Sequence, residues 1–191
     1  MGDVEQYLNE TFSIFENHNK AIYLGEKVTI VQHSIQAAMQ AEQDGQPTHV
    51  VLAALLHDIG HMLGIRDDLP KMVTDQVNIG TIKHEKVAAD YLRERGFPDE
   101  IADLVELHVE AKRYRVAVDP SYELSEASTL TLVHQGGPMS EDEVAAFEAR
   151  ADKDIILKMR EYDERAKDPA VKCKALGLYK DMCRQYLLSV N

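Results

Sequence analysis

Residues 47–64 read PTHVVLAALLHDIGHMLG, and this stretch decides the fold. Pro47 suits the first turn of a helix, and the residues after it are apolar on nearly all sides. Such a helix is stable only when it is buried, so the stretch is expected to be the central helix of the protein. His57, Asp58 and His61 lie in its second half as polar exceptions that need an explanation.

Helical spacing of apolar residues also dominates the rest of the chain. The other ranges expected to be helical are 4–18, 26–43, 82–95, 98–115, 125–135, 140–150, about 152–166 and about 170–189. Residues 65–81 and 116–124 are expected to be loops, and no convincing strand pair is visible. Helices joined by short loops predict an all-α fold, a compact helical bundle that residues 1–191 form as one domain.

His57 and Asp58 are costly residues to place in a buried helix. A buried carboxylate needs a cation or strong hydrogen bonds. A single buried histidine is most often a hydrogen-bonded core residue. Here, however, Asp58 follows directly, and His61 lies one helical turn after His57 and faces the same region. The combination favours a metal site.

Further His and Asp side chains occupy otherwise apolar helix faces. Imidazole suits iron or zinc, and a carboxylate can bridge two ions. Four histidines and two aspartates are more than one open catalytic ion needs, and they suit two ions that each keep open positions. The predicted ligands are His33, His57, Asp58, His84, His108 and Asp163.

Composition excludes several classes of partner and compartment. The net charge is −12, and the basic residues are scattered among acids, so nucleic acid is not an expected partner. The sequence shows no signal peptide and no run of about 18 apolar residues that would cross a membrane. Cys173 and Cys183 would lie about 15 Å apart on one helix, too far for a disulfide. Two free thiols predict a cytoplasmic protein.

The order His33, His57–Asp58, His84, His108, Asp163 resembles the H…HD…H…H…D pattern of the HD-domain superfamily. The dipeptide alone is weak evidence, whereas the complete pattern, with each element on a helix of the expected order, is specific. Most members of the superfamily are phosphohydrolases. A smaller branch holds a mixed-valence di-iron centre and performs oxygenation. Nearly the whole chain resembles the hydroxyphosphonate oxygenases of that branch, the PhnZ and TmpB type.

Residues Tyr23–Leu24–Gly25–Glu26 resemble the Tyr-x-x-Glu loop of these oxygenases. The resemblance implies that Tyr23 ligates one iron in the resting enzyme. It also implies that Glu26 helps to displace the tyrosine when substrate arrives and contacts that substrate. From its residue type alone, Tyr23 is a helix-start aromatic side chain that packs on the core.

The resemblance also assigns phosphonate contacts to His61, Lys112, Ser128 and Gln135, and it places His61 in the catalytic group. Independent chemistry agrees in part: Lys112 follows His108 by one helical turn, and a lysine makes charge-assisted contacts with a phosphonate dianion. Without the resemblance, Lys112 reads as a solvated surface residue and Ser128 as a polar residue at a helix start.

The resemblance implies two Fe ions in a mixed-valence Fe(II)/Fe(III) state, with O2 as co-substrate. The implied small-molecule substrate is 1-hydroxy-2-(trimethylammonio)ethylphosphonate, oxidised to glycine betaine and phosphate. The same chemistry on 2-amino-1-hydroxyethylphosphonate, giving glycine, is the nearest alternative. An upstream Fe/2-oxoglutarate hydroxylase is the implied source of the substrate.

Two alternatives come from other functional classes. A metal-dependent phosphohydrolase could use the same six ligands to activate water. It has no evident use for a displaceable Tyr23. A non-catalytic sensing domain would be expected to lack some of the metal-binding positions, and all six are present.

Overall fold

The apolar stretch forms two consecutive helices at the centre of the protein, α3 (Thr48–Leu56) and α4 (Ile59–Arg66), in a computed structural model that describes residues 2–22 and 27–190. The prediction of one continuous helix was therefore wrong. His57 keeps helical angles (φ −55°, ψ −34°), but Asp58 leaves the helical region (φ −106°, ψ 8°). The break turns the chain at the polar dipeptide.

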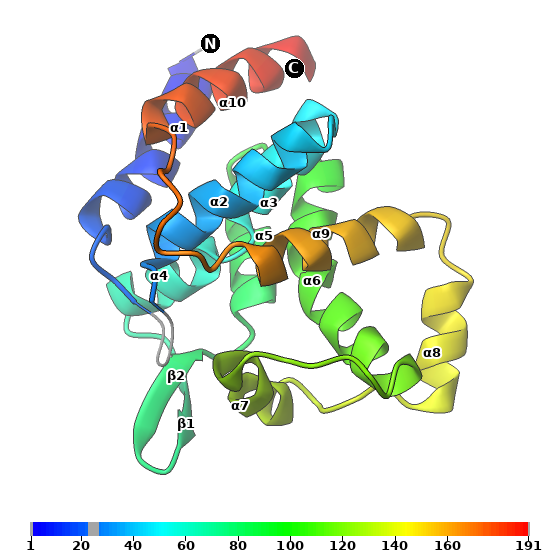
Figure 1. Cartoon of the computed structure of the whole chain (residues 1–191). Coiled ribbons are helices and arrows are strands. Elements are labelled where there is room, and N and C mark those ends of the chain that lie inside the picture. Colours follow the sequence, from blue (N-terminus) through cyan, green and yellow to red (C-terminus); the bar gives the residue numbers. More distant parts are fainter. Residues whose placement is uncertain (1, 23–26, 191) are drawn as a thin grey trace.

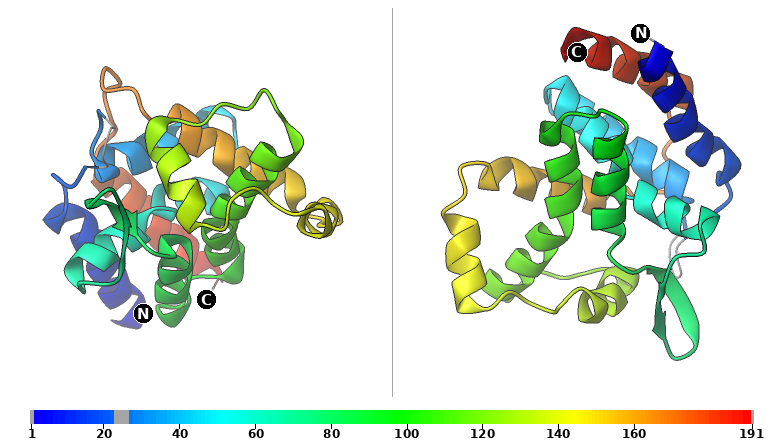
Figure 2. Two further views of the ribbon diagram at one scale, coloured as in Figure 1. Left: turned by 90° about the horizontal axis from the view of Figure 1, so that it is seen from below. Right: turned by 180° about the vertical axis from the view of Figure 1, so that it is seen from behind.

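The other helices of the described residues surround this pair (Figure 1). They are α1 (Gly2–Asn17), α2 (Ile30–Gln43), α5 (His84–Glu94), α6 (Asp99–Val118), α7 (Glu126–His134), α8 (Glu141–Glu148), α9 (Lys153–Arg165) and α10 (Leu176–Val190). Helices α2, α6 and α9 pack on α3, and α5 packs on α4. Helices α1 and α10 lie side by side, so the two termini are close together, and α8 lies on the opposite side of the molecule (Figure 2). The helical fold class is confirmed.

The core is one cluster of buried apolar side chains centred on α3. Leu52, Leu55 and Leu56 are fully buried there. By length and composition, residues Thr48–Arg66 could cross a membrane, although no such segment was predicted from the sequence. However, 83% of the most apolar part of this segment is buried inside the protein. That burial is typical of a core helix.

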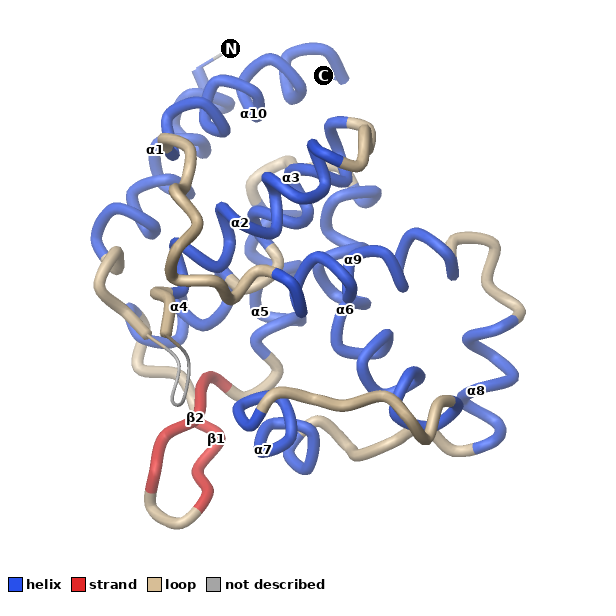
Figure 3. The backbone as a smooth tube through the Cα atoms, viewed as in Figure 1, coloured by secondary structure: helices blue, strands red, loops and turns tan. Residues whose placement is uncertain are grey.

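A β-hairpin occupies most of the stretch that we predicted to be a loop (Figure 3). Strands β1 (Lys71–Thr74) and β2 (Val77–Thr81) pair antiparallel, and the prediction that no strand pair exists was wrong. The turn residues Asp75 (φ 50°) and Gln76 (φ 66°) both have left-handed backbone angles, as the type I′ turn of a two-residue hairpin loop requires. Glycine is the usual sign of such a turn, and neither residue is glycine.

The cysteines lie in different elements. Cys173 is in the segment before α10, and Cys183 is buried in α10, so they do not share one helix as predicted. Both are free thiols. Helix α6 also continues to Val118, so the predicted loop 116–124 begins later than expected.

Gly60 allows α4 to approach the start of α5. A Cβ atom on Gly60 would lie 1.9 Å from the carbonyl oxygen of His84, a backbone atom that cannot move aside freely. We expect Gly60→Ala to destabilise the protein by about 1–3 kcal/mol or more in urea unfolding. Gly177→Ala is the matched control, because no described atom outside its own stretch of helix lies within 4 Å of its added Cβ. Equal unfolding midpoints for both variants would contradict the close approach.

Candidate metal centre

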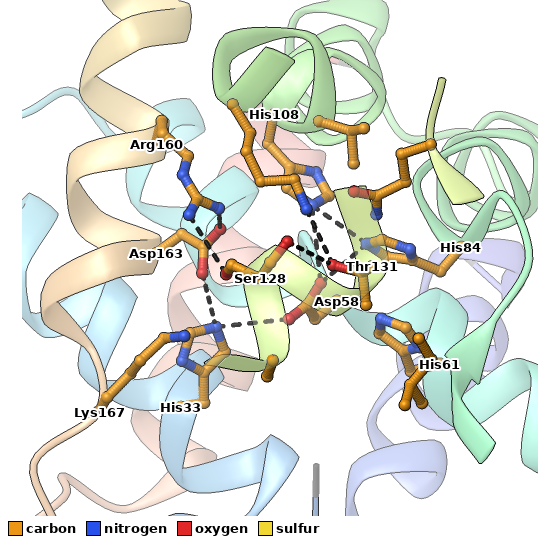
Figure 4. Close-up of a pocket in the computed structure, with 15 residues that line it drawn as sticks. His33, Asp58, His61, His84, His108, Ser128, Thr131, Arg160, Asp163 and Lys167 are labelled. Carbon is orange, nitrogen blue, oxygen red and sulfur yellow. Dashed lines mark hydrogen bonds and ion pairs between the residues drawn. The ribbon is translucent and has the colours of Figure 1, made fainter. Parts of the chain in front are cut away.

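The structure brings all six predicted ligands together in the interior of the bundle (Figure 4). Each is at most 8% exposed. Helix α2 carries one of them, the α3–α4 break two, and α5, α6 and α9 one each. They are His33, His57, Asp58, His84, His108 and Asp163.

Backbone carbonyl oxygens orient three of the four histidines. The contacts are His33 Nδ1 to Ala166 O (3.0 Å), His57 Nδ1 to Ala54 O (2.8 Å) and His108 Nδ1 to Val105 O (2.7 Å). A carbonyl can only accept, so each Nδ1 is the donor and each neutral ring presents the lone pair of Nε2. His84 Nδ1 lies 3.3 Å from the carboxylate oxygen Oε2 of Glu85, an ion-pair contact without hydrogen-bond geometry, and the charge of that oxygen favours a proton on the same ring nitrogen.

These lone pairs face one another in two couples. His33 Nε2 lies 3.1 Å from His57 Nε2, and His84 Nε2 lies 3.2 Å from His108 Nε2. Two neutral acceptors at that separation repel each other unless a proton or a metal cation lies between them and their neighbours. The donor set, imidazole nitrogen with carboxylate oxygen, is the one that iron and zinc accept. The residues therefore fit a pair of metal ions.

Asp58 stands between the two couples. Its Oδ2 is 3.4 Å from His33 Nε2 and 3.2 Å from His57 Nε2. Its Oδ1 is 3.2 Å from His84 Nε2 and 3.7 Å from His108 Nε2. One carboxylate thus contributes an oxygen to each group, as a bridge between two ions requires.

Asp163 makes the two groups unequal. Its Oδ1 lies 3.2 Å from His33 Nε2, while its Oδ2 accepts a hydrogen bond from Arg160 at 2.5 Å. The other group consists of His84 and His108. Among the described residues, Asp58 is the one carboxylate that approaches their Nε2 atoms, and it is shared with the first group. That side keeps more room for an exogenous ligand.

The charges of the site match a metal centre. Burial raises the pKa of Asp58, but the imidazoles of His57, His33 and His84 outweigh burial and hold it well below its usual range. Burial, together with His57 and His84, lowers the pKa of His108 to about 3. Burial lowers the pKa of His33, but hydrogen bonds with Asp163 and Asp58 outweigh it and raise the pKa to about 10. The carboxylates therefore demand positive charge at the position where a metal would lie.

A pocket lined by cations and hydroxyl groups opens onto these ligands. Of the predicted substrate contacts, His61, Lys112, Ser128 and Gln135 all line it. Lys112 Nζ donates to Thr131 Oγ1 at 3.0 Å. Burial, followed by the charge of Arg160, lowers the pKa of Lys112 to about 7. Lys112 is thus a buried ammonium poised to gain stability from an anion.

The pocket is also lined by three residues that were not predicted from the sequence: Thr131, Arg160 and Lys167. Arg160 is only 3% exposed, and its guanidinium reaches both Asp163 and Ser128 Oγ, the latter at 3.4 Å. Helical spacing could have revealed two of the three. Arg160 precedes Asp163 by three residues on α9, and Thr131 follows Ser128 by three on α7. Lys167 follows α9 and gave no such signal.

His61 has the opposite tautomer from the four ligand histidines. Its Nδ1 accepts the backbone N–H of Thr81 at 3.0 Å, so its proton resides on Nε2. Its ring stacks on His84 with centroids 3.9 Å apart. Burial and the neighbouring His84 lower the pKa of His61 well below its usual range. His61 is a neutral hydrogen-bond donor beside the predicted metal ligands. The predicted Tyr23 and Glu26 lie outside the described residues.

Comparison with known proteins adds a family to this geometry. Residues 30–172 match the family described as HD domain, a range that includes the six converging residues. The uncharacterized protein L432 of Acanthamoeba polyphaga mimivirus is 39% identical over 98% of this chain and 84% of its own length. The [1-hydroxy-2-(trimethylamino)ethyl]phosphonate dioxygenase (glycine-betaine-forming) of Leisingera caerulea is 40% identical over 87% of this chain and 81% of its own. The hydroxymethylphosphonate dioxygenase of Gimesia maris is 33% identical over 88% and 82%, respectively.

Replacing Asp58 with Ala removes the carboxylate that both groups share. After loading with ferrous iron, the metal content is expected to fall from about two ions per chain to well below one. Metal analysis of the desalted protein checks this. Asp67→Ala, at the exposed C-terminal end of α4, is the control and should bind as much iron as the unmodified protein. A nearly full complement of iron in the Asp58 variant would refute the bridge.

Lys112→Met is expected to stabilise the metal-free protein. The pKa of Lys112 is about 7 in the folded state and about 10.4 when unfolded. Below pH 7 both states carry the proton, and the folded state bears the full cost of burying it. As pH rises from about 7 to about 10, only the unfolded state holds the proton, so the unmodified protein regains stability.

The increase in the free energy of unfolding caused by Lys112→Met should therefore be largest below pH 7, about 2–4 kcal/mol, and nearly absent at pH 10.5. Urea unfolding at several pH values checks this. Lys86→Met, exposed on α5, should show no such trend. A gain that does not depend on pH would mean that Lys112 is not a strained cation.

Proposed function

The chain belongs to the HD-domain family, and from this premise we propose that it is a non-heme di-iron oxygenase that cleaves the carbon–phosphorus bond of 1-hydroxy-2-(trimethylammonio)ethylphosphonate, giving glycine betaine and phosphate. One observation carries the proposal. Two couples of facing imidazole lone pairs, joined by Asp58, open onto a pocket that contains Lys112, Arg160 and Lys167. A metal centre beside a cationic pocket suits an anion that must reach the metals.

The metal half of the proposal assigns one ion to each group. His33, His57, Asp58 and Asp163 would hold the first, and Asp58, His84 and His108 the second. Bound there, two irons in a mixed-valence state would supply the electron transfer that O2 chemistry needs. Asp58 would fix their separation, and the carbonyl-bound histidines would fix their orientation. Burial of all six side chains would keep bulk water away.

The anion half of the proposal concerns the phosphonate group. Arg160 and Lys112 would neutralise its oxygens, and the hydroxyl groups of Ser128 and Thr131 would donate to them. A dianion would also draw a proton onto Lys112, whose pKa is about 7 in the free protein. His61 would donate from Nε2 to the part of the substrate nearest His84. Gln135, at the end of α7, has a buried Oε1 that accepts no hydrogen bond from the described residues. It would contact the substrate at the pocket edge.

Tyr23 and Glu26 complete the proposal. Tyr23 would occupy the more open iron in the resting enzyme, and Glu26 would help displace it on substrate binding. Such an exchange would keep O2 from the metals until the substrate is present. We further propose that residues 1–191 form a single domain and that the protein is cytoplasmic, a location that suits two free thiols. An upstream Fe/2-oxoglutarate hydroxylase would supply the substrate.

The choice of substrate rests on similarity. The glycine-betaine-forming relative is 40% identical, and the hydroxymethylphosphonate dioxygenase is 33% identical. The trimethylammonio substrate is therefore proposed ahead of 2-amino-1-hydroxyethylphosphonate and of hydroxymethylphosphonate. All three carry a hydroxyl group and a phosphonate on one carbon, so the same pocket chemistry serves each.

The reaction balances without a further reductant. The C–H and C–P bonds of the substrate are broken, and both atoms of O2 enter products, which are the carboxylate of glycine betaine, hydrogen phosphate and one proton. We expect iron-loaded protein in air to release phosphate and glycine betaine in equal amounts. Each candidate substrate is tested separately, with phosphate measured by colorimetry and the organic product by mass spectrometry.

An anaerobic assay separates the proposal from its rival. Phosphate release should stop without O2, because the oxidation cannot proceed. Release that continues anaerobically would instead indicate the phosphohydrolase reaction, in which the same ligands activate water. Absence of turnover of every hydroxyphosphonate by fully iron-loaded protein would refute the proposed function.

A further inference from the structure

We propose that Gln36 is a positioning residue that holds residues 166–168 against α2 and thereby orients both a metal ligand and a pocket cation. We call residues 166–168 the strap. The inference deepens the proposed function, on which its chemical meaning rests. Gln36 lies three residues after His33 on α2, is 3% exposed, and does not line the pocket.

The amide of Gln36 pairs with both peptide groups of Asp168. Its Nε2 donates to the carbonyl oxygen of Asp168 at 2.8 Å, and its Oε1 accepts the N–H of Asp168 at 3.1 Å. One side chain thus binds the backbone as a neighbouring strand would. Among the described residues, the side chain of Asp168 bonds locally, to the N–H of Ala170 at 2.8 Å. Gln36 therefore recognises the backbone of the strap and not its side chain.

The strap has no regular structure of its own. Helix α9 ends at Arg165 and α10 begins at Leu176. Within the strap, the carbonyl of Ala166 accepts from His33 Nδ1 at 3.0 Å, and Lys167 Nζ donates to Ser125 Oγ at 2.8 Å. Lys167 also lines the pocket, near His33 in Figure 4. A displaced strap would therefore move both the acceptor that fixes the tautomer of His33 and a cation of the anion site.

The chemistry at this contact requires an amide. Glutamate is nearly the same size, but its carboxylate would place negative charge against the carbonyl of Asp168, where Gln36 now donates. Leucine would leave both peptide groups of Asp168 without this partner. Both substitutions should release the strap, and neither touches a metal ligand directly.

The first test measures iron retention. Gln36→Glu and Gln36→Leu are loaded with ferrous iron, and release to a chelator is followed by absorbance. Loss of a partner that orients a ligand typically weakens metal binding about 10- to 100-fold, so release of iron should accelerate about tenfold or more. Gln43→Glu and Gln43→Leu, exposed at the end of α2, are matched controls that should release iron at the rate of the unmodified protein.

The second test measures anion binding by calorimetry with inorganic phosphate as the probe. Gln36→Leu should weaken phosphate binding several-fold, because Lys167 loses its position. In the double variant with Lys167→Met, the loss should be no greater than for Lys167→Met alone, because both changes act on one cation. Additive losses would overturn the link from Gln36 to the pocket.

Thermal unfolding distinguishes positioning from a purely structural role. A lower melting temperature with unchanged iron release and unchanged phosphate affinity in the folded protein would overturn the proposal. If Gln36→Leu does not fold, Gln36→Glu decides alone by the same two measurements. Neither measurement needs turnover, so failure of the oxygenase assay and failure of this inference remain separate results.

Discussion

The separation between imidazole nitrogens is the constraint on which the rest of the structure depends. Three of the four rings donate from Nδ1 to backbone carbonyls, so in the neutral state their Nε2 lone pairs face the centre, where the Nε2 atoms of the four histidines lie 3.1 and 3.2 Å apart in two couples. Asp58 adds negative charge from the middle. Such an arrangement is unfavourable in an apolar core unless cations neutralise it. The apolar contacts between the helices must therefore hold the histidines and Asp58 together. For this reason α3, which is among the most buried elements, leads directly into the site.

The break between α3 and α4 is a consequence of the same demand. In a continuous helix, the side chains of successive residues such as His57 and Asp58 point about 100° apart. Asp58 instead leaves the helical region, and its two oxygens reach both couples of histidines. Gly60, two residues after Asp58, has no Cβ, and this lets the carbonyl of His84 approach. The His57–Asp58 dipeptide, the break between α3 and α4 and the close approach of α4 to α5 thus act together to place the Asp58 carboxylate between the histidines.

The sequence was sufficient to predict the helical fold and the convergence of the six predicted ligands, because most of these side chains interrupt apolar helix faces and their order matches the HD-domain pattern. It was insufficient where conformation depends on tertiary contacts. The hairpin was missed because Asp75 and Gln76 adopt left-handed angles without glycine and because the strands are short. Arg160 was missed because an arginine on a late helix looks solvated until Asp163 and Ser128 enclose it. Lys112 and Ser128 were predicted only through the resemblance to the hydroxyphosphonate oxygenases, because lysine and serine are also common on the surfaces of helices.

The hairpin has two ends with very different freedom to change. At its base, the N–H of Thr81 fixes His61, and a Cβ on Gly80 would lie 2.5 Å from the ring of His61. At its tip, Asp75 and Gln76 are exposed and are not among the residues that line the pocket. Lengthening the tip by whole residue pairs would preserve the pairing of Lys71 with Thr81, whereas a slip of one residue would carry the donor away from His61. Insertions at the tip can therefore add new surface contacts without disturbing the imidazole at the base of the hairpin.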